Sequence, residues 1–332
     1  MNSITLRAYG KVNLALDVTG RRGDGYHYVR MVLQAVDVYD EVKVSFEDDD
    51  PDPDPLPERE ADESSIADDR PKDRKIYISC SRPFVPLDES NLAYKAADKM
   101  FKKYGIKKKC HIHIEKNIPM AAGMAGGSAD CAAVIMAVNR LAALDLDQKT
   151  LDVIATELGA DVPFCLRNIS DAEEVSLHKT ELKACLAEGI GEKLTLIKGL
   201  TNCYLFMAKP DFDISTPEVY KKLDSYPEIY DRAELSAQKG KIHPDIDGLI
   251  QGLASADIKK AALCVKNILE PIAAEGHSEI AQLENCMNEH GALASLMSGS
   301  GPTVFGIFEN KTDAERAFDA AADGIWKKIV SM

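Results

Sequence analysis

The feature that most constrains the fold of this chain is a segment rich in glycine and alanine between two apolar elements. Residues 110–115 alternate apolar and polar side chains and predict a strand, while residues 131–139 are almost wholly apolar and predict a buried helix. The residues between them, 116–130, read KNIPMAAGMAGGSAD. A strand, a small-residue loop and a helix in this order direct backbone N–H groups and the positive end of the helix at one point. Such a point is a natural binding site for a phosphate group.

The loop matches neither of the two commonest phosphate-binding motifs. It does not end in Gly-Lys-Ser or Gly-Lys-Thr, so it is not a Walker A loop, and its glycines at 123, 126 and 127 do not form a G-x-G-x-x-G fingerprint. Small residues would also allow a buried helix to pack close to a strand. The loop alone therefore leaves a phosphate site and a packing role open.

Composition narrows the class of protein. The 332 residues allow one large domain or two ordinary ones, and 45% hydrophobic residues are enough for real cores. A net charge of −14 argues against nucleic acid or an anionic membrane as the main partner. The eight cysteines form no C-x-x-C pair, which is typical of a reducing compartment, and no apolar stretch approaches the length of a membrane span. We expect a soluble cytoplasmic protein, either a monomer or a homodimer.

Two alternating runs near the N-terminus, residues 3–8 and 11–18, predict strands. The two-residue period places Lys11 and Asn13 on one face of the second strand, about 7 Å apart. Taken alone, Lys11 is better explained as a solvent-facing lysine.

A tight glycine-rich turn over residues 21–27 ends in Tyr26 and His27. Together these two side chains offer a stacking face and a hydrogen-bonding ring. A Tyr-His pair also suits the beginning of a strand, and the alternation that follows predicts one from residue 28 to about residue 46.

Residues 48–74 consist largely of Asp, Glu and Pro, and a segment of this kind cannot repay the entropy cost of ordering. We expect a mobile surface loop there. The chain resumes with a predicted strand at 75–80 and a helix at 91–101, for which Ser90 or Asp88 is the expected N-cap.

One isolated carboxylate stands out after the glycine loop. A helix predicted over residues 147–158 ends at Gly159, and Asp161 then precedes an apolar run, residues 162–166, that predicts a strand. A lone Asp at such a turn is usually a turn residue or a cap, although apolar neighbours also suit a partly buried functional charge. Residues 168–184 are polar, carry charges of both signs and resemble an insertion.

The C-terminal third alternates strands with helices. Strands are expected at 194–197, 203–210 and 303–308. Helices are expected after a cap at Ser215 or Thr216, from Asp257 through Leu269, from Ser278 to His290 and from about Thr312. A second cluster of glycine and serine, residues 298–302, again lies beside a strand end. This order of elements predicts a split β-α-β arrangement.

Several motifs together resemble one enzyme superfamily, the GHMP kinases. Residues 119–128 resemble its phosphate loop, and residues 298–302 (SGSGP) resemble its C-terminal glycine motif. Residues 11–14 (KVNL), 20–27 (GRRGDGYH) and 158–163 (LGADVP) are similar to those of one branch, which phosphorylates a cytidine diphosphate derivative of methylerythritol. Further matches to that branch are Asn91-Leu92, Gly189-Ile190-Gly191-Glu192 and Ser215-Thr216-Pro217 with Tyr220. The similarity spans nearly the whole chain apart from the two insertions.

The resemblance implies an α+β, two-domain GHMP kinase fold. Residues 1–167 would form an N-terminal α/β domain like the second domain of ribosomal protein S5, with the acidic loop 48–74 inserted in it. Residues 168–332 would form a ferredoxin-like split β-α-β domain with an insertion at 168–184.

The resemblance also implies a reaction, in which ATP with Mg²⁺ phosphorylates the 2-hydroxyl of the methylerythritol unit in the non-mevalonate isoprenoid pathway. Asp161 would accept the hydroxyl proton, while Lys11 would keep Asp161 ionised and neutralise charge on the transferred phosphoryl group. These roles agree with phosphoryl transfer, in which positioning and electrostatics supply most of the catalysis.

The resemblance assigns the binding residues as well. Those expected around ATP are Asn91, Lys116, Pro119, Met120, Ala121, Ala122, Gly123, Met124, Ala125, Gly126, Gly127, Ser128 and Ala129. Those expected around the substrate are Asn13, Tyr26, His27, Thr216, Pro217 and Tyr220. Tyr26 and Tyr220 would stack on the cytosine, and His27 would read its hydrogen-bonding edge. Ser128 is a candidate Mg²⁺ ligand by its loop position, and the other metal ligands stay open.

The chain departs from the family pattern in two short stretches. Met124-Ala125 replaces a common Leu-Gly pair, and Ala125 carries a cost if its position requires a positive φ. Residues 267–270 resemble a family element in which Ile268 replaces Asp, so we assign them no role.

Two alternatives are weighed against this function. Another small-molecule GHMP kinase, acting on mevalonate or homoserine, would have no base to stack on Tyr26, His27 and Tyr220. A GHMP-fold protein that only binds a ligand would not need both Lys11 and Asp161.

Overall fold

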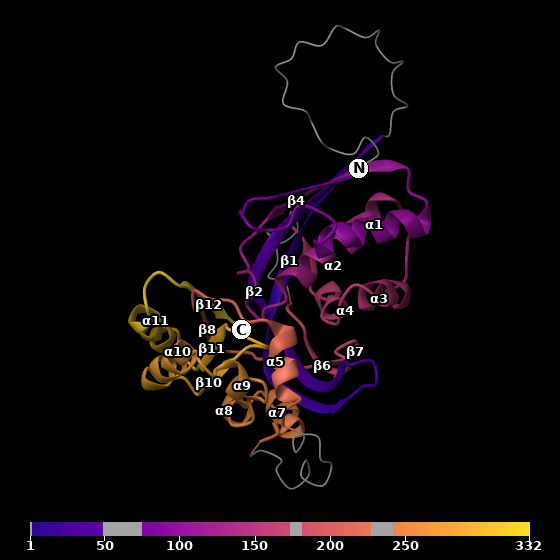
Figure 1. Ribbon diagram of the computed structural model, residues 1–332. Coiled ribbons are helices and arrows are strands. Elements are labelled where there is room, and N and C mark those ends of the chain that lie inside the picture. Colours follow the sequence, from indigo (N-terminus) through magenta and orange to yellow (C-terminus); the bar gives the residue numbers. More distant parts are fainter. Residues whose placement is uncertain (1, 49–74, 173–180, 227–241) are drawn as a thin grey trace, which may run out of the picture.

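The structure is a computed structural model that describes residues 2–48, 75–172, 181–226 and 242–332. Two sheets form its framework (Figure 1). Helices α1 to α4 lie on one side of the larger sheet, while α10 and α11 cover the smaller one (Figure 1). Within the described residues, no helix combines the length and the apolar character needed to cross a membrane.

In the described part of the chain, the larger sheet has eight strands. They are β1 (Ser3–Arg21), β2 (His27–Asp48), β3 (Ile76–Cys80), β4 (Lys108–Glu115), β5 (Ile169–Asp171), β6 (Ala184–Gly189), β7 (Lys193–Ile197) and β9 (Lys266–Asn267). The long antiparallel pair β1–β2 is its centre, and its register shifts between Tyr9 and Lys11 and again between Asn13 and Ala15. Such irregularities re-aim side chains locally, and here they flank Lys11 and Asn13.

Four helices accompany this sheet: α1 (Leu92–Tyr104), α2 (Gly126–Leu141), α3 (Gln148–Thr156) and α4 (Val162–Leu166). Helix α2 is buried along most of its length and packs on β1 and β2, as its apolar sequence predicts. Helix α1 begins one residue later than expected, because Asn91 is its N-cap and accepts a hydrogen bond from the Ala93 amide at 2.9 Å. Ser90 and Asp88 bond to each other instead.

The smaller sheet confirms the split β-α-β prediction. Its strands are β8 (Tyr204–Lys209), β10 (Ala294–Met297), β11 (Val304–Phe308) and β12 (Trp326–Ser331), in the spatial order β10-β11-β8-β12 with all neighbours antiparallel. The helices of this part of the chain are α5 (Thr216–Leu223), α7 (Ile246–Ala254), α8 (Ile258–Ala262), α9 (Glu270–Ala273), α10 (Ser278–Glu289) and α11 (Lys311–Ala320). Strand, helix, two strands, helix and strand in this order are the ferredoxin-like pattern.

Two predictions of local structure are wrong. The apolar run after Asp161 forms helix α4, because Pro163 suits a first helical turn and a run of five apolar residues has no decisive periodicity. The helix predicted from Asp257 through Leu269 ends at Ala262, since the following residues join the larger sheet as β9, parallel to β1.

Two further differences concern boundaries. The helix predicted at 131–139 already begins at Gly126, inside the glycine run. The presumed insertion 168–184 contains β5, which pairs with β1, and its last residue opens β6. Because β5, β6 and β7 all follow residue 167 and still join the larger sheet, the division at 167/168 stays a prediction. The acidic loop from residue 49 to residue 74 lies outside the described residues.

Candidate active site

A cleft of about 1040 Å³ brings together almost all the residues that the sequence singled out. The predicted residues that line it are Lys11, Asn13, Tyr26, His27, Asn91, Lys116, Pro119, Met120, Ala121, Ala122, Gly123, Ala125, Gly126, Gly127, Ser128, Asp161, Thr216, Pro217 and Tyr220. Met124 and Ala129 do not line it, because their side chains face the core and are 1% and 0% exposed.

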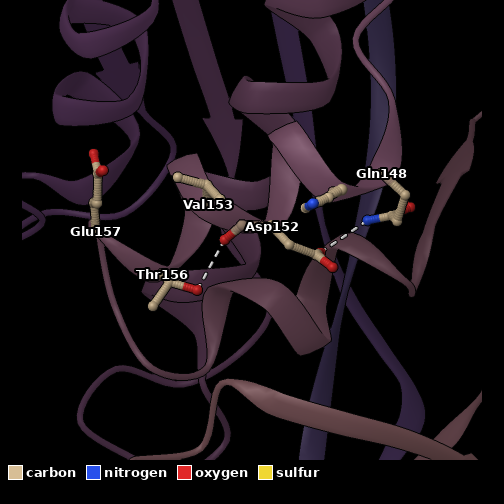
Figure 2. Close-up of a pocket in the computed structure, with 6 residues that line it drawn as sticks. Gln148, Asp152, Val153, Thr156 and Glu157 are labelled. Carbon is tan, nitrogen blue, oxygen red and sulfur yellow. Dashed lines mark hydrogen bonds between the residues drawn. The ribbon is translucent and has the colours of Figure 1, made fainter.

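A second hollow lies on the exposed side of α3 (Figure 2). Its lining comes from a single helical segment, residues 148–157, and two of its hydrogen bonds run from Gln148 and Thr156 to Asp152 (Figure 2). Both bonds join residues of the same helix. Residues from several elements meet in the large cleft, whereas this hollow is lined by one element only.

The glycine loop opens directly into the first turn of α2. Ala125 is the N-cap in the left-handed conformation, with φ of 58°, and no side chain caps this helix end. The first N–H groups of a helix have no partner within it, and Gly126 and Gly127 leave the backbone open to a ligand. This geometry suits a phosphate group and favours the anion-site reading over packing alone.

Gly123 joins the two glycine-rich loops. Its carbonyl accepts hydrogen bonds from Lys11 Nζ at 2.7 Å and from Ser298 Oγ at 3.0 Å. The Ser298 hydroxyl also accepts the Asn13 amide at 3.2 Å. Gly123 has φ of 69°, and a Cβ here would lie 2.1 Å from the carbonyl oxygen of Ser298, so no other residue fits.

Asn267 supports the site, although the sequence did not indicate a role for it. Its side-chain amide donates to the carbonyls of Met297 at 2.8 Å and Gly299 at 2.6 Å, while its backbone pairs with Leu16 of β1. It thereby ties the second glycine loop to the strand that carries Lys11. The resemblance of residues 267–270 to a family element was the sequence feature that could have pointed to this role.

The central pair of the cleft is Lys11 and Asp161. Lys11 Nζ lies 3.9 Å from Asp161 Oδ2 and donates to Asn13 Oδ1 at 2.6 Å, so Lys11 and Asn13 do share one face of the strand. The Lys11 side chain is 5% exposed and that of Asp161 is 30% exposed. Asp161 is the N-cap residue of α4, yet its side chain makes no capping hydrogen bond. The carboxylate is therefore available to a ligand in the cleft.

Lys116 is held between two carboxylates at the floor of the cleft. Its ammonium bonds to Asp40 and, at 2.7 Å, to Asp130, while the other Asp40 oxygen accepts the amides of Asn117 and Ile118 at 2.6 and 2.8 Å. Burial alone would lower the pKa of Lys116, but the two carboxylates raise it above its usual value. Burial raises the pKa of Asp130. The cluster fixes the beginning of the loop against β2 and α2.

Asn91 is also committed to the protein. Besides capping α1, its side-chain amide donates to the Pro86 carbonyl at 2.8 Å. Direct contacts of Asn91 and Lys116 with ATP stay predictions.

The other end of the cleft is built from α5 and the β1–β2 turn. Thr216, Tyr220 and Asp224 are spaced four residues apart and so share one side of α5. The His27 ring lies 4.9 Å from that of Tyr220, and its Nε2 lies 2.8 Å from Asp224 Oδ1. Burial raises the pKa of Tyr220, and the nearby Asp161 charge adds to this, so the phenol stays protonated. Tyr26 is 61% exposed at the rim.

Asp224 and Arg21 were missed as site residues, although both line the cleft. Arg21 lies 3.4 Å from the second oxygen of Asp224, so one carboxylate links His27 to a cation. The spacing of Asp224 from Tyr220, one helical turn, was the signal that would have pointed to it. Thr216 meets the second glycine loop at Ser300, with 2.6 Å between the hydroxyls.

Comparison with known proteins agrees with this geometry. Residues 91–168 match the family model described as GHMP kinases N terminal domain, and residues 249–324 match the one described as GHMP kinases C terminal. The fold and the site thus define a small-molecule kinase of the GHMP type.

Whole-chain similarity is more specific. A 4-diphosphocytidyl-2-C-methyl-D-erythritol kinase of Clostridioides difficile (strain 630) is 41% identical over 315 residues, which cover 95% of this chain and 90% of that protein. The chain belongs to the 4-diphosphocytidyl-2-C-methyl-D-erythritol kinase family, as its motifs predicted.

Solved structures agree. The crystal structure of a 4-(cytidine 5'-diphospho)-2C-methyl-D-erythritol kinase matches with a TM-score of 0.71 and 26% identity, covering 99% of this chain and 100% of that one. The homoserine kinase from Cytophaga hutchinsonii matches with a TM-score of 0.68 and 20% identity, covering 100% and 95%. The second match shows the shared fold alone.

Proposed function

We propose that this chain transfers the γ-phosphoryl group of ATP to the 2-hydroxyl of 4-(cytidine 5'-diphospho)-2-C-methyl-D-erythritol. The products are the 2-phosphate and ADP, in the non-mevalonate pathway to isoprenoid precursors. The observation that carries the proposal is that the Lys11–Asp161 pair lies in the same cleft as the glycine loop and the Tyr26, His27 and Tyr220 rings. A phosphate donor and an aromatic base have complementary subsites on the two sides of one carboxylate.

In the proposed mechanism Asp161 accepts the proton of the 2-hydroxyl as the oxygen attacks the γ-phosphorus. Its carboxylate is not used as a helix cap, which supports this role. Lys11 lies within reach of the charge that develops during transfer, and its bonds to Asn13 and to the Gly123 carbonyl fix its position relative to the loop. The N–H groups at the beginning of α2 bind the triphosphate.

The base subsite supports a cytidylyl substrate. Tyr26 and Tyr220 supply aromatic faces on which a base can stack, and the His27 ring, held by Asp224, supplies a hydrogen-bonding edge. Mevalonate and homoserine have no ring to fill this subsite. An Asp161 carboxylate beside a buried lysine also argues for catalysis over ligand binding alone.

Mg²⁺ generally accompanies ATP in GHMP kinases. The Ser128 hydroxyl is an oxygen donor that lines the cleft, and the described residues contain no group of three or more His, Cys, Asp or Glu side chains able to hold a metal. This sparse oxygen set fits Mg²⁺, which takes most of its ligands from phosphates and water. Ser128 would hold the ion, which would neutralise phosphate charge when bound, and Asp161 stays available as the base.

The proposed setting is the cytoplasm. All eight cysteines are unpaired, which supports a reducing compartment.

A substrate panel tests the proposal. Purified protein with Mg-ATP is offered the cytidylyl substrate, mevalonate and homoserine, and ADP release is measured. We expect turnover with the cytidylyl alcohol alone. Turnover only with an alcohol that lacks a nucleobase would contradict the proposed function.

A further inference from the structure

The proposed substrate carries a diphosphate between its base and its reacting alcohol, and that group needs a positive charge in the cleft. Two negative charges must lie in the cleft between the aromatic subsite and Asp161. The cations that line the cleft are Lys11, Arg21, Lys116 and Lys221. The first three already have partners.

Each of these three is held by protein oxygens. Lys11 donates to Asn13 and Gly123 beside Asp161, and Lys116 lies between the two carboxylates of its buried cluster. Arg21 lies 3.4 Å from Asp224. Redirecting any of them to a substrate phosphate would break a contact that positions the loop, the base or His27.

Lys221 differs from the other three. Its side chain is exposed, lines the cleft and makes no hydrogen bond or ion pair with any other residue that the structure describes. It directly follows Tyr220, and it lies one helical turn beyond Pro217 on α5. In a nucleoside diphosphate the phosphates follow the base and ribose, so a cation next to the stacking residue is well placed for them.

We propose that Lys221 binds the diphosphate of the nucleoside diphosphate substrate. The inference rests on the proposed function, because it assumes that the base occupies the Tyr26–Tyr220 subsite. A lysine suits this task because its ammonium is a compact charge on a flexible stem. It can therefore approach a phosphate oxygen from several directions. Because no described residue bonds to its side chain, no contact within the described part of the chain is lost when the substrate binds.

The neighbouring Lys222 provides a matched control. It lies on the same helix and is also a partly exposed lysine, but it pairs with Glu275 and does not line the cleft. Replacing either residue by Ala removes one positive charge from α5.

The test is calorimetric titration of the full-length protein with CDP and with cytidine, without ATP. For Lys221→Ala we expect the Kd for CDP to rise roughly tenfold and that for cytidine to change less than twofold, because only CDP carries the phosphates. The tenfold difference should shrink at high salt, and Lys221→Arg should restore most of the affinity. Lys222→Ala should leave both ligands unchanged.

Three outcomes would overturn the inference: unchanged CDP affinity in Lys221→Ala, an equal loss for CDP and cytidine, or an equal loss in Lys222→Ala. Because the titration needs no turnover, it separates the two proposals. Normal phosphorylation of the cytidylyl substrate with unchanged CDP binding in Lys221→Ala would reject the role of Lys221 alone. Absence of CDP binding by the unsubstituted protein would reject the base subsite as well.

Discussion

The ammonium of Lys11 lies 3.9 Å from a carboxylate oxygen of Asp161, across the junction between β1 and α4. The two groups are close enough to stabilise each other, but Lys11 makes its short hydrogen bonds to Asn13 and Gly123. Asp161 therefore keeps an oxygen for the substrate, while Lys11 stays fixed to the phosphate loop. In the proposed mechanism this arrangement separates the base, Asp161, from Lys11, the group that stabilises charge.

Asp161→Asn should lower kcat by roughly a thousandfold, because an amide cannot accept the hydroxyl proton. Nucleotide affinity should change little, since the variant keeps the shape of the side chain. Steady-state turnover and ATP-analogue titration measure the two effects. Asp98→Asn, at an exposed ion pair on α1, is the control and should retain full turnover. Near-normal turnover of Asp161→Asn would remove Asp161 from the mechanism.

Asp224→Asn tests the support of the base subsite. The variant loses the charge that holds His27 Nε2 and Arg21, so we expect KM for the cytidylyl substrate to rise about tenfold with kcat and the KM for ATP nearly unchanged. If Asp224 were needed only for folding, the substitution would change kcat and both KM values together. Asp213→Asn, which alters the ion pair between an exposed carboxylate and the mostly buried Lys209, should behave like the unsubstituted enzyme.

Ala125→Gly should stabilise the protein. Ala125 has φ of 58°, a conformation that costs a residue with a side chain roughly 1–2 kcal/mol and costs glycine almost nothing. Since glycine also loses more entropy on folding, we expect a net gain of about 0.5–1 kcal/mol in urea unfolding. Ala122→Gly is the matched control, because Ala122 has no positive φ and is buried, and it should destabilise. Destabilisation by Ala125→Gly would contradict the inference that the positive φ strains the backbone at Ala125.

Stability should fall as pH rises from about 4.5 to about 8 because of Glu284. Burial raises the pKa of Glu284 from 4.5 to about 8, and the neighbouring Glu270 carboxyl raises it as well. Since the folded-state pKa lies above the unfolded one, the stabilisation from the protonated carboxyl is complete below about pH 4.5 and is lost as pH rises to about 8. Glu270 accepts a hydrogen bond from the Met297 backbone amide at 2.7 Å. Because Met297 directly precedes the second glycine loop, ionisation of Glu284 would also destabilise that loop.

Glu284→Gln keeps a neutral side chain at every pH. Its melting temperature at pH 9 should exceed that of the unsubstituted protein by a few degrees, and the two should converge near pH 5. Calorimetry across this range measures the difference. Glu279→Gln, at an exposed position at the beginning of α10, is the control. Parallel pH profiles for Glu284→Gln and the unsubstituted protein would contradict the raised pKa.

Much of the site could be predicted from the sequence because its parts are local. A strand, small-residue loop and helix follow one another directly, and a two-residue period is enough to place Lys11 and Asn13 on one face. The ferredoxin-like order of elements was likewise visible in the alternation of strands and helices. The errors arose where short apolar segments have no decisive period, as after Asp161, or where a segment pairs with a distant strand, as at Asn267.

The sequence by itself therefore determined the glycine loop, the neighbouring lysine and asparagine, and the resemblance to a kinase family. Only the tertiary structure decided that Gly123 meets Ser298, 175 residues away, and that His27 meets Asp224, 197 residues away. It also decided that the Asp161 side chain caps no helix and that Lys221 faces the cleft without a partner among the described residues. The physical reason is that periodicity and turn chemistry depend on neighbours in the chain, whereas hydrogen bonds and charge pairing across the cleft depend on how the two sheets pack.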